Sequence, residues 1–94
     1  MIGGDPQEFL DGLYYGFEQV FVYRGRTLCA QGWREPDGRW LLTVDQWDLD
    51  IEDWHVWDHR SVDPQECFNA FLTAPLFDGR TFWEAEGEIE HLYA

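Results

Sequence analysis

The residues best suited to chemistry in this sequence are its carboxylates, which outnumber the basic residues by nineteen to six. The excess lies mainly in the second half, since residues 1–44 carry six acids and four Arg, whereas residues 45–94 carry thirteen acids and two Arg. The densest run, "DQWDLDIED" at 45–53, contains five acids and no base. A net charge of −13 disfavours direct binding to nucleic acid or to an anionic membrane, and favours a basic protein as the partner.

A metal site is one interpretation of the acidic run. Asp48-x-Asp50-x-Glu52 resembles the beginning of a calcium-binding loop. The match then fails, because Asp53 stands where such a loop requires glycine and His59 stands where it requires a bidentate glutamate. We therefore expect no calcium and no other cofactor.

The histidines and cysteines are the other candidates for catalysis or metal binding. His55 and His59 are four residues apart, on one side of an expected strand, with Asp58 between them, but a zinc or nickel site needs a third fixed ligand. We interpret both as partly exposed structural histidines. Cys29 and Cys67 lack a C-x-x-C spacing and any nucleophile signature, so we expect two reduced thiols. An enzyme is therefore disfavoured, although a small metal-dependent enzyme built on the two histidines and the Asp cluster stays an alternative.

The acids are interleaved with tryptophans, which is typical of a surface that binds basic proteins. Carboxylates form charge-assisted hydrogen bonds with Arg and Lys, and Trp adds apolar or cation–π anchors. In a strand, the alternating Glu residues at 84–90 would form a row of charges spaced like the phosphates of one DNA strand. The competing interpretation is a solvated acidic face with most Trp in the core. The expected partner-binding residues are Asp45, Trp47, Asp48, Asp50, Glu52, Asp53, Trp54, Trp57, Asp58, Glu84, Glu86, Glu88 and Glu90.

The composition indicates one folded domain over residues 1–94. Hydrophobic residues make up 45% of the chain and aromatics 18%, which is too apolar for a disordered acidic tail. We find no basic, apolar leader after Met1 and no apolar run of membrane-spanning length, so we expect a cytoplasmic location.

The elements that must position these residues are marked by caps and turns. The tetrapeptide "DPQE" occurs at 5–8 and at 63–66, where Asp caps a helix, Pro begins it and Glu closes a capping box. These signals predict a helix at 6–15 and a second helix from residue 64 to a stop at "AP". Between them, turn signals at 24–25 and 35–38 separate strands expected at 17–23, 26–34, 39–45 and 54–59.

The C-terminal segment admits two interpretations. Thr81-x-x-Glu84 is a further capping box, followed by apolar residues at helical spacing, whereas the alternation of Glu from 84 to 90 suits a strand. Because Glu, Ala and Gly are poor strand formers, we predict a helix at 82–92. The expected fold is α+β, an antiparallel four-stranded β-meander packed on one face by helices, in the order α-β-β-β-β-α-α.

The pattern formed by "FLDGLYYG", "YRGR", "QGW" and "AFLTAPLFDGRTFWE" resembles short bacterial proteins, often of mobile elements. Small acidic proteins of that setting look like anti-CRISPR inhibitors or toxin-immunity proteins. The resemblance implies the class of inhibitor. Together with the acidic residues, it leads us to expect a non-enzymatic inhibitor that mimics DNA toward a basic nucleic-acid-binding protein such as a Cas complex. The alternative is an immunity protein that neutralises a cognate nuclease toxin.

Overall fold

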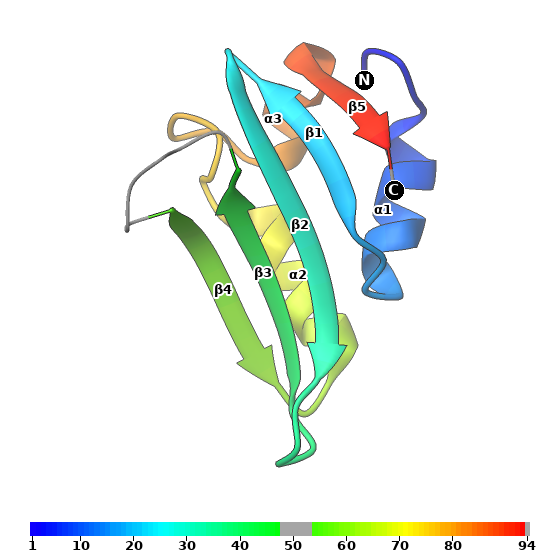
Figure 1. Ribbon diagram of the computed structural model, residues 1–94, viewed down its shortest axis with the longest axis vertical. Coiled ribbons are helices and arrows are strands. Elements are labelled where there is room, and N and C mark those ends of the chain that lie inside the picture. Colours follow the sequence, from blue (N-terminus) through cyan, green and yellow to red (C-terminus); the bar gives the residue numbers. More distant parts are fainter. Residues whose placement is uncertain (48–53, 94) are drawn as a thin grey trace.

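The computed structural model describes residues 1–47 and 54–93, and its secondary structure follows the predicted order until the C-terminal segment (Figure 1). The elements are α1 (Pro6–Tyr14), β1 (Gln19–Tyr23), β2 (Arg26–Arg34), β3 (Trp40–Gln46), β4 (His55–Ser61), α2 (Pro64–Thr73), α3 (Phe82–Ala85), the 3-10 turn η1 (Glu86–Glu88) and β5 (Ile89–Tyr93).

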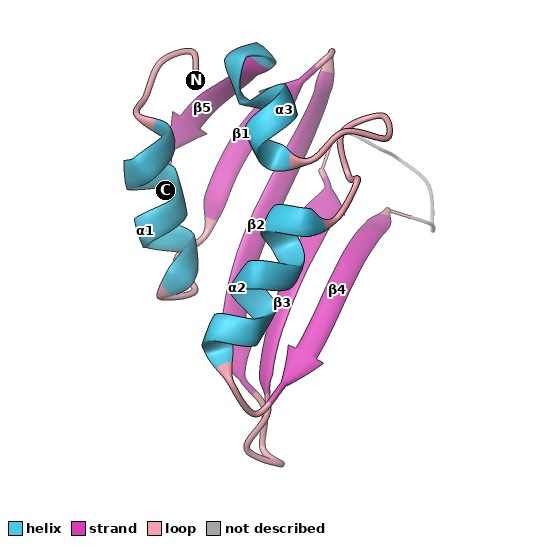
Figure 2. Ribbon diagram, turned by 180° about the vertical axis from the view of Figure 1, so that it is seen from behind, coloured by secondary structure: helices cyan, strands magenta, loops and turns pink. Residues whose placement is uncertain are grey.

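The strands form one antiparallel sheet in the order β4-β3-β2-β1-β5. The meander predicted for the first four strands is confirmed, and both of its tight turns use the expected residues. Arg24 and Gly25 take positive φ angles at the first turn, and Gly38 does so at the second. The helices cover one face of this sheet (Figure 2), and among the described residues no helix covers the other face. The α+β class and the two-layer arrangement are therefore as predicted.

The predicted helix at 82–92 is wrong beyond residue 85. The helix ends after one turn, and β5 then pairs antiparallel with β1, placing Ile89 opposite Tyr23 and His91 opposite Phe21. The sheet in the described part of the chain therefore has five strands rather than four. The reason is that β1 would otherwise leave a row of backbone groups unpaired at the sheet edge, and pairing with β5 satisfies them.

The repeated "DPQE" does begin two helices, although its Glu residues act differently from the prediction. The side chains of Asp5 and Asp63 accept hydrogen bonds from the backbone N–H of Gln7 and Gln65, at 2.8 and 3.0 Å. Glu66 does not turn back to its cap; its carboxylate accepts from Ser61 Oγ at 2.8 Å. The two Asp caps thus mark where the helices begin, and Glu66 links helix α2 to Ser61 at the end of β4.

The core lies between the helices and the covered face of the sheet. It is rich in aromatic rings, and its members are Phe9, Leu10, Leu13, Phe21, Tyr23, Leu28, Ala30, Leu42, Val44, Cys67, Phe71, Phe77, Phe82, Ala85 and Ile89. On α2, Cys67 and Phe71 are fully buried, whereas Phe68 and Leu72 pack against the core but are only partly buried. Over residues 1–47 and 54–93, no helix has the length and apolarity needed to cross a lipid bilayer.

Candidate functional site

The uncovered face of the sheet gathers several of the predicted partner-binding residues. Cys29 pairs with Val20 on one side and with Asp45 on the other, and their chain neighbours Leu28, Phe21 and Val44 belong to the core. Because side chains alternate along a strand, these three residues point away from the helices. The same register assigns to this open face Val20, Val22, Thr27, Cys29, Gln31, Trp33, Leu41, Thr43, Asp45, Trp47, His55, Asp58, Arg60 and Glu90.

The open face is mostly apolar and buried in its middle, where Asp45 is the charged member, and its outer strands carry Asp58, Arg60 and Glu90. Val20, Cys29 and Leu41 are buried even though no described helix covers them, because neighbouring strands shield them. Asp58 lies on β4 and Glu90 on β5, which are the two outer strands of the sheet. A partner approaching this face would thus meet carboxylates before it reached the apolar centre.

Asp45 and Asp58 hold an imidazole between them. His55 Nδ1 lies 2.7 Å from Asp45 Oδ1, and His55 Nε2 lies 2.6 Å from Asp58 Oδ2. An ionised carboxylate only accepts hydrogen bonds, so both ring nitrogens must donate, which requires the protonated imidazolium. Burial alone would lower the pKa of His55, but its hydrogen bonds to the two carboxylates outweigh burial and raise that pKa above 6.5. The pair of acids is thus partly neutralised within the protein.

His55 and His59 do not share one side of β4, contrary to the four-residue spacing. Asp45 pairs with His55 while Val44 pairs with Trp57, so the register shift inserts an extra residue in β4. Such a bulge reverses the alternation of side chains, and His59 faces Glu66 of α2 at 3.2 Å instead. Within the residues that the structure describes, no group of three or more His, Cys, Asp or Glu side chains is arranged to hold a metal ion.

We call His55 with its two carboxylates, Asp45 and Asp58, the histidine clamp, and we expect it to make the stability of the protein depend on pH. His55 has a higher pKa in the folded chain than in the unfolded chain, so its contribution is complete below pH 6.5 and is lost as the pH rises through the folded pKa. A titration of the imidazole by NMR should give His55 a pKa above 6.5. Over the same pH window, the free energy of unfolding should fall in the wild type relative to His55→Gln. Parallel pH profiles of the two proteins would show that the clamp contributes nothing.

The C-terminal glutamates form neither a helical face nor the row of charges that a strand over 84–90 would give, because they belong to three different elements. The carboxylate of Glu84 accepts from the backbone N–H of Thr81 at 2.9 Å, which is the Glu half of the predicted capping box. Glu86 pairs with the N-terminal ammonium group at 2.6 Å. Glu88 binds arginines, as described next, and Glu90 is exposed on β5. Of the four residues, Glu90 is therefore the one best placed to meet a partner.

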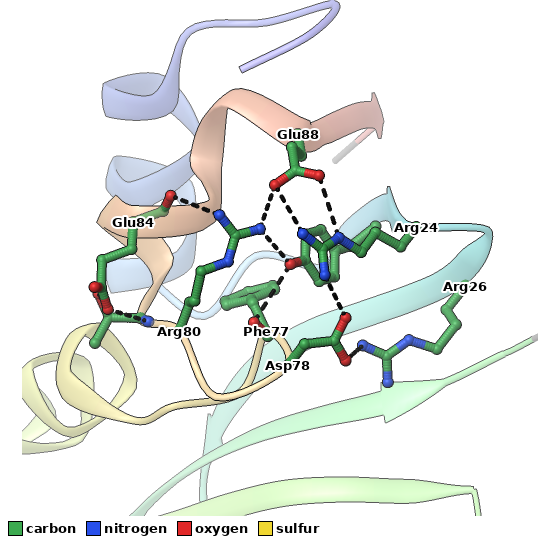
Figure 3. Close-up of polar contacts among 9 residues, drawn as sticks. Arg24, Arg26, Phe77, Asp78, Arg80, Glu84 and Glu88 are labelled. Atoms are coloured by element: carbon green, nitrogen blue, oxygen red, sulfur yellow. Dashed lines mark hydrogen bonds and ion pairs between the residues drawn. The ribbon is translucent and has the colours of Figure 1, made fainter.

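Figure 3 shows Glu88 between Arg24 and Arg80. The guanidinium groups of these two arginines lie 5.2 and 5.9 Å from the ring centre of Tyr23. The guanidinium of Arg24 bonds both Glu88, at 3.2 Å, and Asp78, at 3.0 Å. Arg80 bonds Glu88 as well and donates to the Tyr23 hydroxyl at 2.6 Å. The hydrogen bonds from Arg24 and Arg80 lower the pKa of Glu88. This network attaches the C-terminal segment to the tip of the β1–β2 hairpin, so these charges serve the fold.

Three of the remaining arginines are also held by the protein's own groups, at or near the β2–β3 turn, whereas Arg26 lies beside the β1–β2 turn and pairs with Asp78 at 3.6 Å. Arg39 pairs with Asp37 at 2.9 Å, and Arg60 pairs with Glu35 at 2.8 Å. Arg34 donates to the carbonyl of Gly38, and its guanidinium lies 5.7 Å from the ring centre of Trp40. The positive charges of this molecule are thereby engaged at two ends of the sheet.

The three tryptophans predicted to contact a partner differ in their exposure to solvent. Trp47 and Trp54 are exposed at the end of β3 and just before β4. Trp57 is less accessible, since its ring lies 6.1 Å from that of Phe71 in the core. The predicted contact residues between Trp47 and Trp54 lie outside the described residues: Asp48, Asp50, Glu52 and Asp53.

Exposed aromatic residues outside the acidic runs were missed by the sequence reasoning. Tyr14, Tyr15 and Phe17 lie at the end of α1 and just beyond it, and Trp83 lies on α3. The sequence does contain a signal for the first group, because "YYGF" continues past the buried stripe formed by Phe9, Leu10 and Leu13. Aromatic residues that fall off the apolar stripe of an amphipathic helix have no place in the core.

No protein-family model matches the chain, and neither a curated protein nor a solved structure shows significant similarity to it. What the molecule can do therefore has to follow from its own charges, exposed rings and hydrogen bonds.

Proposed function

We propose that this protein is a non-enzymatic acidic inhibitor that binds the basic, nucleic-acid-binding surface of a bacterial protein, as an anti-CRISPR-like mimic of DNA. The distribution of charge carries the proposal. Each arginine is engaged with an acceptor or carboxylate of the protein itself. Glu18 and Glu90, in contrast, are exposed and have no arginine within ion-pair distance among the described residues. The surface offered to a partner is consequently negative.

The mechanism is steric and electrostatic, and it needs no chemical step. Glu90 on the outer strand β5 pairs with Arg or Lys of the partner, while Trp47 and Trp54 add apolar contacts. The acids of 48–53 contribute further charge between these two tryptophans. Occupation of the basic surface excludes nucleic acid from it, and a cytoplasmic location would give access to such partners. Charge complementarity of this kind also speeds association.

The test is displacement of DNA from candidate partners. A fluorescently labelled duplex is bound to purified Cas effector complexes and, separately, to nuclease toxins, and its anisotropy is followed as the protein is added. We expect release of the duplex from one partner, with the inhibition weakening at least about tenfold between low salt and about 0.5 M salt. Inhibition that does not change with salt would contradict the electrostatic mechanism.

The variants separate the acidic segment from the rest of the surface. Neutralising Asp48, Asp50, Glu52 and Asp53 together to their amides should weaken inhibition at least about tenfold. The control is Glu8→Gln on α1, which removes an exposed charge from the covered side of the sheet. Unchanged inhibition by the fourfold variant would rule out the acidic segment as the contact. Tight binding to a nuclease toxin alone would select the immunity protein instead.

A further inference from the structure

Four aromatic rings form a continuous exposed patch on the helix layer, at the end of α1 and on α2. Ring centres are 5.3 Å apart for Tyr14 and Tyr15, 6.2 Å for Tyr15 and Phe17, and 5.6 Å for Tyr14 and Phe68. Tyr15 is 67% exposed and Phe17 62% exposed, whereas Phe68 is partly buried and anchors the group to the core. We call the group Tyr14, Tyr15, Phe17 and Phe68 the aromatic patch. Exposure of several neighbouring aromatic rings to water is unfavourable, and contiguous apolar surface of this kind is typical of interaction sites.

The backbone that carries the aromatic patch is fixed from both sides. The amide of Gly16 donates to the carbonyl of Leu13 at 2.9 Å, and the amide of Phe17 donates to the carbonyl of Gly12 at 3.0 Å. The carbonyl of Gly16 in turn accepts from the amide of Gly32 in β2 at 3.2 Å. The turn is therefore tied to the sheet, and the rings are presented by a rigid support. Preorganised aromatic residues are the usual anchors of protein interfaces.

The charges around the aromatic patch select a cation. Asp11 is exposed and lies three residues before Tyr14 on the same side of α1, and Tyr15 follows directly at the end of the helix. Its carboxylate accepts one hydrogen bond, from Gln7 Nε2 at 2.9 Å, and keeps further acceptor positions. The last turn of α1 contains no basic residue to offset the negative end of the helix dipole, and residues 1–23 contain no Arg, Lys or His. Arg34 does approach this turn through Trp40, whose ring lies against Gly16, but its guanidinium is engaged with the Trp40 ring and with the carbonyl of Gly38. The faces of aromatic rings are themselves negative. Ring faces, a carboxylate and a helix C-terminus therefore all favour positive charge at this place.

The negative charge of the protein disfavours the other ligands that exposed aromatic rings commonly bind, namely single-stranded nucleic acid, an anionic membrane and a second copy of the chain. Single-stranded nucleic acid stacks on exposed rings only where a basic groove holds its phosphates, and an anionic membrane would be repelled by a net charge of −13. A second copy of the chain would bring the same repulsion. Arginine fits better than lysine, because a planar guanidinium stacks on an aromatic ring while it bonds a carboxylate.

We propose that the aromatic patch is a second interaction surface, which binds an arginine-bearing segment of a basic protein. The guanidinium groups stack on Tyr15 and Phe17 and reach Asp11. The inference goes beyond the proposed inhibition, because the patch lies on the helix layer, opposite the open face (Figure 2).

A labelled hexa-arginine peptide is the probe, and its anisotropy is measured with the full chain and its variants. Tyr15→Ala/Phe17→Ala should bind the peptide about tenfold more weakly than the wild type, and hexa-lysine should bind the wild type more weakly than hexa-arginine. The matched control is Trp83→Ala, which removes a 51% exposed ring from α3. No loss of affinity in the double variant would overturn the proposal by showing that net charge alone attracts the peptide. An equal loss in Trp83→Ala would overturn it by showing that the peptide does not distinguish the aromatic patch from other exposed rings.

Amide shifts measured by NMR during the peptide titration supply an independent check. We expect the largest changes in residues 11–17 and at Phe68, and shifts confined to β3 and β4 would contradict the patch. The peptide titration requires no natural partner. It can therefore support the aromatic patch even if the DNA-displacement experiment contradicts the proposed inhibition. If the double variant loses peptide binding but still displaces DNA, the two surfaces act separately.

Discussion

Gly16→Ala is expected to destabilise the protein by about 3 kcal/mol or more, because two independent penalties meet at this residue. The backbone of Gly16 has a φ of +82°, a conformation that costs a residue with a side chain about 1–2 kcal/mol. A Cβ atom at this position would also lie 2.4 Å from the carbonyl oxygen of Gly32 and 2.8 Å from the ring of Trp40.

The neighbours of Gly16 cannot move away cheaply. Gly32 belongs to a central strand whose register with β1 and β3 is fixed on both sides, and its own amide donates to the Gly16 carbonyl. Trp40 is packed against the core at the start of β3. Relief of the clash therefore requires α1 to shift relative to the sheet, which disturbs the packing of the core.

Chemical denaturation followed by tryptophan fluorescence measures the effect of Gly16→Ala. For a domain of this size, a loss of about 3 kcal/mol corresponds to a melting temperature lower by about 10–20 °C. Gly38→Ala is the matched control, since Gly38 has a φ of +89° but a methyl group added there would meet no described atom within 4 Å. It should lose only the conformational cost, about 1 kcal/mol. Equal losses in the two variants would show that the contacts with Gly32 and Trp40 are unimportant.

Local signals were enough to predict most of the fold. The caps at Asp5 and Asp63 and the turns at 24–25 and 35–38 depend on residues within four positions of one another, so a short window contains them. The prediction of a helix at 82–92 failed because the capping box at Thr81 and Glu84 was taken to start a long helix. The carboxylate of Glu84 does bond the backbone at the start of α3, but the chain after Gly87 is decided by pairing with β1, more than sixty residues away.

For the candidate site, the sequence predicted the types of residues but not which of them are free to contact a partner. The sequence shows where carboxylates are dense, but it does not show which of them have partners within the protein. Glu86 meets the N-terminal ammonium group from 85 residues away, and Glu88 meets Arg24 from 64 residues away. Such contacts depend on tertiary structure, and they turn two predicted contact residues into parts of the fold. The bulge in β4 is likewise invisible in a four-residue spacing of histidines.

Phe82→Ala should cost about 3–5 kcal/mol, which is a large share of the roughly 5–15 kcal/mol that stabilises a typical domain. Phe82 is fully buried, and its ring stacks on that of Phe9 with centres 5.4 Å apart. It also lies 5.9 Å from the ring of Phe71 and 6.4 Å from that of Phe77. The side chain thus joins α1, α2 and the turn before α3, and its removal leaves a cavity that these three parts line.

The neighbouring residue supplies the control for Phe82→Ala, because Trp83 is larger but half exposed. Trp83→Ala should cost less than about 1.5 kcal/mol in the same denaturation measurement, and Phe82→Leu should fall between the two since it fills most of the space. A further readout follows from the position of Phe82 just before η1 and β5. Loss of the ring releases the anchor of that segment, so hydrogen exchange should rise first in β5 and in β1, which pairs with it. Exchange that rose uniformly over the sheet would instead mean that α3 and β5 unfold only with the whole domain.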